Sequence, residues 1–126
     1  MSNTLNLKNK KVLVVEDDQM NLIYLNQIFK IAQGTFTHAK NGQTALKIYN
    51  EDSDWDLVLM DLQLPDMNGL EITREIRAKN TTVPIIAQTA AKSPEEQQEA
   101  LSVGCTDLLL KPYTIESFFE IVKKYI

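Results

Sequence analysis

The chain has 126 residues and a net charge of −4, and 44% of its residues are hydrophobic. This length fits one domain with a substantial core, and the acidic balance argues against nucleic acid as a direct ligand. The single cysteine, Cys105, excludes an internal disulfide, and no apolar run approaches the length of a membrane span. We therefore expect a cytoplasmic protein without membrane contact.

Short apolar runs alternate with amphipathic segments from Lys11 onward, after a polar lead-in over residues 1–10. The runs predict five β-strands: Lys11–Val15, Thr35–Ala39, Leu57–Met60, Pro84–Thr89 and Asp107–Leu110. Predicted helices cover Gln19–Gln33, Asn41–Asn50, Gly69–Lys79, a segment from a cap at Ser93 to a stop at Gly104, and a last segment capped by Thr114. Alternating strands and helices predict an α/β domain over residues 11–126. Its five-stranded parallel sheet is expected in the flavodoxin-like order 2-1-3-4-5, with helices on both faces.

Four of the predicted strands end on polar side chains. Asp17, preceded by Glu16, follows the first strand; Asp61 follows the third, Thr89 ends the fourth, and Lys111 follows the fifth. Ligands of open parallel sheets gather beyond the carboxyl ends of the strands. The sequence therefore predicts one site that combines an acid cluster, a hydroxyl and a lysine.

The predicted acid cluster has the chemistry of a magnesium site. Carboxylates that lie close together repel one another, and a hard divalent cation removes that repulsion. We expect Glu16, Asp17, Asp61 and the backbone carbonyl of Gln63 as ligands. Asp61 could then act as a nucleophile toward a phosphoryl group, which requires its ionised form.

Lys111 and Thr89 complete this set of groups. The ammonium would neutralise charge on the transferring phosphoryl group, and the hydroxyl would supply a donor. We expect Mg²⁺ and Lys111 together to favour the charged form of Asp61.

These residues carry a resemblance to a known family. The matching pieces are Val14-Val15-Glu16-Asp17, Leu59-Met60-Asp61-Leu62-Gln63-Leu64-Pro65, Gly69-Leu70-Glu71, Thr89-Ala90 and Lys111-Pro112. Together and in this order they resemble a response-regulator receiver domain, from about Lys11 to Ile126. The resemblance implies a two-component or phosphorelay signalling switch, and a signalling protein rather than an enzyme.

The resemblance also implies roles for single residues. Asp61 would accept phosphate from a phosphohistidine on a histidine kinase or histidine phosphotransfer protein, while Thr89 and Lys111 would contact the phosphoryl group. The acids Glu16 and Asp17 would bind Mg²⁺ with Asp61 and the Gln63 carbonyl. A cis peptide bond is expected before Pro112.

Two further features bear on the resemblance. The run Glu16-Asp17-Asp18 followed by Asn21 resembles receivers of hybrid histidine kinases and phosphorelays. Asp18 lies one place beyond the usual acid pair, so we expect it to start the first helix rather than bind metal.

The chain departs from the family pattern at two places. Leu108 stands where many receivers have a Tyr or Phe that turns inward on phosphorylation. Output would then depend mainly on movement of the segment after Thr89 and its helix. Gln63 and Ala91 occupy positions that tune phosphate lifetime in the family, and Ala91 has no polar group to orient water. We therefore hypothesise a long-lived phospho-state.

Two apolar surfaces suggest partners. Met20, Ile23, Tyr24 and Ile31 extend the apolar surface of the first helix, which is either covered or a docking patch for a helical phosphodonor. Phe118, Phe119 and Ile121 of the last helix could contribute to output contacts or to a phosphorylation-linked homodimer. The output protein is not identified by the sequence.

Other function classes remain as alternatives. A haloacid-dehalogenase-type phosphohydrolase would need a second acid two places after Asp61, where this chain has Gln63. A nucleotide- or flavin-binding module would need a glycine- or hydroxyl-rich loop after the first strand, where this chain has three acids, Glu16, Asp17 and Asp18. A receiver-like scaffold could signal by binding without phosphorylation. The Met1 start suggests a single-domain protein, and an excised domain of a larger regulator is the alternative.

Overall fold

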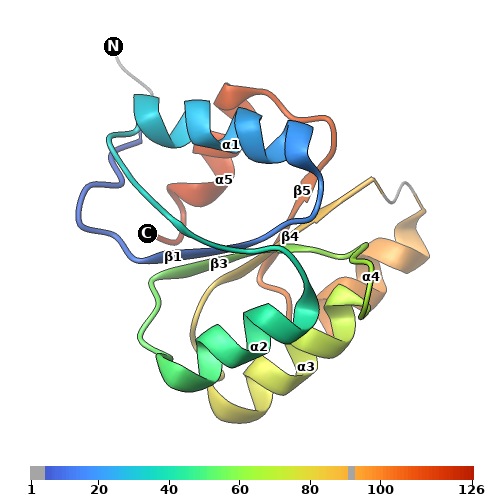
Figure 1. The fold of residues 1–126 in the computed structure, drawn as a ribbon. Helices are drawn as coiled ribbons and strands as arrows, with labels where there is room; N and C mark the ends of the chain where they lie inside the picture. Colours follow the sequence, from blue (N-terminus) through green and yellow to red (C-terminus); the bar gives the residue numbers. More distant parts are fainter. Residues whose placement is uncertain (1–4, 91–92) are drawn as a thin grey trace.

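The computed structural model describes residues 5–90 and 93–126, and Figure 1 shows an α/β sandwich. Its elements in chain order are β1 (Val12–Val15), α1 (Gln19–Ile31), β2 (Thr37–Ala39), α2 (Gly42–Glu51), β3 (Leu57–Asp61), α3 (Gly69–Lys79), β4 (Ile85–Thr89), α4 (Pro94–Ser102), β5 (Asp107–Leu110) and α5 (Ile115–Val122). All strands pair in parallel, in the order β2-β1-β3-β4-β5. The predicted fold class and strand order are confirmed. Among the described residues, no helix is long and apolar enough to cross a bilayer.

The helices cover the two faces of the sheet unequally. Helices α1 and α5 lie on one face, and α2, α3 and α4 lie on the other (Figure 1). Because side chains alternate along a strand, β1, β3, β4 and β5 contribute to both layers of the core, whereas β2 contributes only Ala39 to the layer of α2, α3 and α4. In β3, Leu57 and Leu59 face α1 and α5, while Val58 and Met60 face the other layer.

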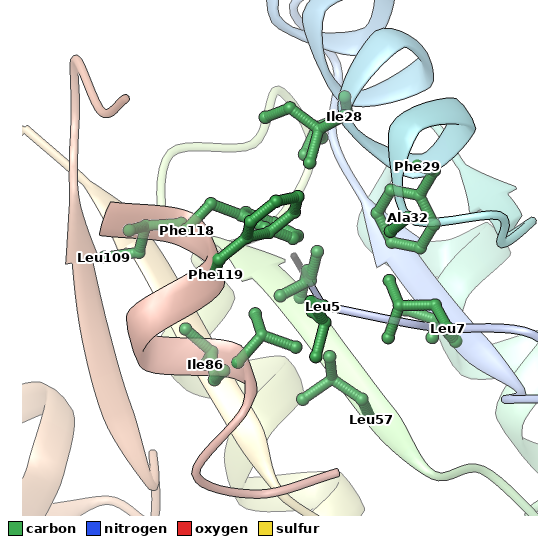
Figure 2. Packing of buried hydrophobic residues seen from close by; sticks show 14 of the residues in the cluster. Leu5, Leu7, Ile28, Phe29, Ala32, Leu57, Ile86, Leu109, Phe118 and Phe119 are labelled. Carbon is green, nitrogen blue, oxygen red and sulfur yellow. The ribbon is translucent and has the colours of Figure 1, made fainter. Parts of the chain in front are cut away.

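Figure 2 shows the core between the sheet and helices α1 and α5. Its labelled side chains are Leu5, Leu7, Ile28, Phe29, Ala32, Leu57, Ile86, Leu109, Phe118 and Phe119. Leu5 and Leu7 precede the expected domain start, yet they are buried, and the Leu7 N–H donates to the Ala32 carbonyl at 2.8 Å. Residues 5–7 therefore pack into this layer, while the boundary at residue 10 stays a prediction.

Helix α1 ends two residues before the expected Gln33. The chain turns at Gln33, which has a positive φ of 60°, and the Gly34 N–H donates back to the Phe29 carbonyl at 2.8 Å. A Cβ on Gly34 would lie 2.5 Å from the Leu7 Cβ. Glycine is therefore required here so that residue 7 can pack against the end of the helix.

Tyr49 of α2 is 1% exposed, and its hydroxyl has no hydrogen-bond partner among the described residues. A buried donor without a partner costs about 1–3 kcal/mol, so the hydroxyl offsets part of what the ring contributes. We expect Tyr49→Phe to leave the free energy of unfolding unchanged or to raise it by about 1 kcal/mol. Urea denaturation with an unchanged m-value would measure this. A loss of stability would show that the hydroxyl is bonded, for example to a buried water.

Candidate functional site

The sheet brings the predicted polar side chains to one edge. Glu16 and Asp17 follow β1, Asp61 ends β3, Thr89 ends β4, and Lys111 follows β5. Strands β1, β3, β4 and β5 are consecutive neighbours in the sheet, so their carboxyl ends lie in a row. Residues separated by up to 95 positions therefore meet at a single site.

The three acids form a compact cluster. Glu16, Asp17 and Asp61 each offer a carboxylate oxygen, and these oxygens lie within 4.8 Å of one another. Glu16 and Asp61 are buried, whereas Asp17 is exposed. The cluster thus opens to solvent on the side of Asp17.

Asp18 lies outside this cluster. Its carboxylate caps α1, accepting from the N–H groups of Met20 at 2.9 Å and Asn21 at 3.4 Å. A side-chain oxygen at this position satisfies N–H groups that have no partner within the helix. The expectation that Asp18 starts the first helix is confirmed.

Lys111 provides positive charge beside two of the acids. Its Nζ lies 3.4 Å from Asp61 Oδ2 and 3.5 Å from Glu16 Oε1. Thr89 is buried at the end of β4, and its carbonyl accepts from the Lys111 N–H at 2.9 Å. This main-chain bond joins the end of β4 to the residue that carries the ammonium.

Lys111 does not fully offset the effects that raise the pKa of Asp61. Burial, and then neighbouring Glu16, raise the pKa of Asp61 to about 6. The Gln63 N–H, 2.9 Å from Asp61 Oδ1, and the charge of Lys111 lower that pKa but do not restore it. The pKa of Asp17 is also raised, by burial and then by Asp61. Ionisation of the cluster is therefore less favourable than that of free carboxylates, and added positive charge would favour it.

The donor set fits a small hard cation. Three carboxylates with oxygens close together, partly dehydrated and short of positive charge, match what Mg²⁺ takes in proteins. Gln63 is exposed in the turn after Asp61, and its carbonyl stays a predicted ligand. Ala91, to which the phosphate-lifetime hypothesis refers, lies outside the described residues.

An open hollow of about 450 Å³ lies beside the cluster. Its lining residues come from α1, the end of β4 and the segment after β5: Asp18, Met20, Asn21, Tyr24, Ala90, Lys111, Pro112 and Tyr113. The Lys111–Pro112 peptide bond is cis, as predicted. Met20 is 75% exposed and Ile23 is 54% exposed, so the apolar surface of α1 next to the hollow is not covered by the described part of this chain.

A hydrogen-bonded triad beside Glu16 was missed by the sequence reasoning. Asn21 Nδ2 lies 2.6 Å from Glu16 Oε1, and 3.2 Å from both Gln88 Oε1 and the Tyr113 hydroxyl. The Tyr113 hydroxyl donates to Gln88 Oε1 at 2.7 Å. One signal was available, because Gln88 is a polar residue that directly follows the apolar run of the buried strand β4.

Two further predictions concern the last helix, with Phe118 and Phe119, and Leu108 in β5. Phe118 and Phe119 are buried in the core between α5 and the sheet, and Ile121 is partly buried, so a contribution of the last helix to output or dimer contacts stays a prediction. Leu108, the departure noted in the sequence, is half-buried against the layer of α2, α3 and α4, and the expectation about how output depends on the segment after Thr89 stays a prediction.

Comparisons with known proteins agree on one family. The family model of the response regulator receiver domain matches residues 12–123. The polar-differentiation response regulator DivK of Brucella anthropi is 30% identical over 119 residues, covering 93% of this chain and 96% of DivK. The aerobic respiration control sensor protein ArcB of Escherichia coli K12 is 34% identical over 116 residues, which cover 90% of this chain but 15% of ArcB.

A solved structure supports the same assignment. It is the co-crystal structure of the Saccharomyces cerevisiae histidine phosphotransfer signaling protein Ypd1 and the receiver domain of its downstream response regulator Ssk1. The matching chain is 31% identical with a TM-score of 0.83, covering 92% of this chain and 88% of that chain. The sequence match spans nearly the whole chain, and the structural match covers the same fold. This chain therefore belongs to the response regulator receiver domain family.

Proposed function

We propose that this receiver is a phospho-acceptor switch in which Asp61 takes a phosphoryl group from a partner phosphohistidine. The observation that carries the proposal is the pairing of a buried acid cluster with Lys111, whose Nζ lies 3.4 Å from Asp61 Oδ2. Such a pocket holds a carboxylate nucleophile next to fixed positive charge. The protein would act in signalling rather than on a separate substrate.

Glu16, Asp17, Asp61 and the Gln63 carbonyl would hold Mg²⁺. When bound, the cation would neutralise charge on the phosphoryl oxygens and favour the ionised form of Asp61. The raised pKa of Asp61 in the protein alone supports this role, because burial and Glu16 make its ionised form less favourable than in a free aspartate.

The transfer itself needs few groups from this chain. A carboxylate oxygen of Asp61 forms a bond to phosphorus while the bond from phosphorus to the donor imidazole nitrogen breaks, and the electron pair returns to that nitrogen. The Lys111 ammonium would stabilise the phosphoryl oxygens, and the Thr89 hydroxyl would donate to one of them. The added charge would draw Thr89 and Lys111 inward and so shift the surface after β4.

The hollow beside the acid cluster is the proposed docking site of the phosphodonor. It adjoins Asp61 through Lys111, and exposed Met20 and Ile23 extend it with apolar surface. An amphipathic helix of a histidine kinase or histidine phosphotransfer protein would fit such a surface. The Ypd1 protein in the matched co-crystal structure is a histidine phosphotransfer protein, which supports the same partner class. The output protein and a phosphorylation-linked homodimer remain proposals.

Intact mass spectrometry tests the acceptor. After incubation with acetyl phosphate and Mg²⁺, we expect one phosphoryl group on the natural chain and none on Asp61→Asn. Asp54→Asn is a matched control, because Asp54 is exposed and lies before β3, away from the acid cluster. Omitting Mg²⁺ should abolish the addition.

Two outcomes would contradict the proposal. A phosphoryl group on the Asp61→Asn variant would place the acceptor elsewhere. A natural chain that accepts nothing from acetyl phosphate, nor from a phosphorylated histidine phosphotransfer protein, would favour a scaffold that signals without phosphorylation.

A further inference from the structure

The triad of Asn21, Gln88 and Tyr113 lies directly against the acid cluster. It joins α1, β4 and the segment before α5, which are separated in sequence by up to 92 positions. Its contact with the cluster is the bond from Asn21 Nδ2 to Glu16 Oε1, at 2.6 Å. The other oxygen of Glu16 accepts from the Asp18 N–H at 3.2 Å. Both oxygens of this buried carboxylate are therefore oriented from the α1 side.

The donors of Asn21 are fully used. Its amide has two N–H groups but three acceptors within 3.2 Å: Glu16 Oε1, Gln88 Oε1 and the Tyr113 hydroxyl. Two N–H groups cannot each serve a single acceptor here, so at least one of them is shared. Because Tyr113 also donates to Gln88, the amide plane of Asn21 is fixed by the two groups behind it.

Stability alone does not account for this arrangement. Gln88 is fully buried, and its Nε2 has no hydrogen-bond partner among the described residues. A buried donor without a partner is destabilising, so an apolar side chain at this place in β4 would pack at lower cost. The polar triad is more readily explained by a role at the site that it contacts.

The position of Lys111 indicates what that role is. Lys111 Nζ lies 3.5 Å from Glu16 Oε1, the same oxygen that Asn21 holds. Without Asn21, the carboxylate would be free to rotate toward the ammonium and form a closer ion pair. That pair would compete with a metal ion for the oxygens of Glu16.

We propose that Asn21 is a positioning residue for Glu16, held by Tyr113 and Gln88, and that this triad sets the affinity of the acid cluster for Mg²⁺. The inference rests on the proposed function, in which Glu16 is one of the metal-binding acids. Outer partners of metal ligands commonly change metal affinity by about 10- to 100-fold when they are removed. Here the outer partners also reach the docking hollow, since Asn21 and Tyr113 line it.

Isothermal titration calorimetry with Mg²⁺ tests the inference directly. We expect Asn21→Ala to weaken Mg²⁺ binding about tenfold and Tyr113→Phe to weaken it by a smaller factor. The double variant should lose less than the sum of the two, because both act through one hydrogen-bonded unit. Asn26→Ala on α1 and Tyr125→Phe after α5 are matched controls, and both should bind Mg²⁺ like the natural chain.

The rate of phosphoryl acceptance separates positioning from a general structural defect. Raising Mg²⁺ should recover the rate at which Asn21→Ala accepts phosphate from acetyl phosphate, a donor without the helix that the hollow is proposed to bind. Unchanged Mg²⁺ affinity in Asn21→Ala, or a rate that stays low at saturating Mg²⁺, would overturn the inference. Phosphorylation of Asp61→Asn would instead overturn the proposed function, and it would leave the calorimetric comparison intact.

Discussion

The Asp61→Asn variant is expected to be more stable than the natural chain when no metal is present, by about 1–2 kcal/mol at pH 7.5. Burial and Glu16 raise the pKa of Asp61 to about 6, from 3.8 for an unperturbed aspartate. Between these two values the folded state binds a proton that the unfolded state releases. The free energy of unfolding therefore falls as the pH rises through this window.

The magnitude follows from the size of the pKa difference. A shift from 3.8 to about 6 corresponds to roughly 3 kcal/mol if it were expressed in full, and solvent at the open side of the cluster reduces this value. A neutral amide at position 61 removes the repulsion with Glu16 at every pH. The gain of the variant should therefore disappear below about pH 4, where the natural carboxyl is protonated.

Urea denaturation at pH 4 and pH 7.5, with and without Mg²⁺, measures this effect. Mg²⁺ should stabilise the natural chain at neutral pH and should stabilise Asp61→Asn far less, since binding to the folded state alone raises stability. A variant that is less stable than the natural chain at pH 7.5 without metal would show that Lys111 already balances the acids.

The fold and the gathering of the site were predictable from the sequence because both depend on periodic patterns. Apolar runs with helix-length connections permit few arrangements, and side chains at the carboxyl ends of neighbouring parallel strands must converge. The amino-acid sequence alone therefore placed Asp61 and Lys111 together. The helix ends were less predictable: α1 ends at Ile31, and the turn at Gln33 and Gly34 that follows leaves room for Leu7, a residue distant in the chain.

The triad of Asn21, Gln88 and Tyr113 could not be predicted from patterns in the sequence. Asn21, Gln88 and Tyr113 have no common spacing, and they meet only because α1 and the segment before α5 pack on the same side of the sheet. The sequence likewise left open which surface Phe118 faces. Helical spacing identifies an apolar face, but it does not say whether that face meets the core or a partner.

Lys111→Met is expected to separate metal binding from phosphoryl transfer. Methionine keeps an apolar stem of similar length, so the main change is the loss of the ammonium that lies 3.4 Å from Asp61 and 3.5 Å from Glu16. This ammonium repels a cation that uses the same oxygens. Its removal should tighten Mg²⁺ binding by about 1 kcal/mol, which is roughly fivefold in affinity.

Phosphoryl acceptance should change in the opposite direction. The ammonium is the fixed positive charge that this chain places beside the acceptor carboxylate, and loss of one such group slows transfer by about a hundredfold or more. Calorimetry with Mg²⁺ and the rate of mass gain from acetyl phosphate at saturating Mg²⁺ would measure the two effects, with exposed Lys123→Met as the control. Weaker Mg²⁺ binding in Lys111→Met would show that Lys111 does not compete with the metal, and acceptance of phosphate at the natural rate would show that it does not stabilise the phosphoryl group. Opposite effects of Lys111→Met and Asn21→Ala on Mg²⁺ affinity would show that both residues act on one oxygen of Glu16, the first by competing with the metal and the second by orienting its ligand.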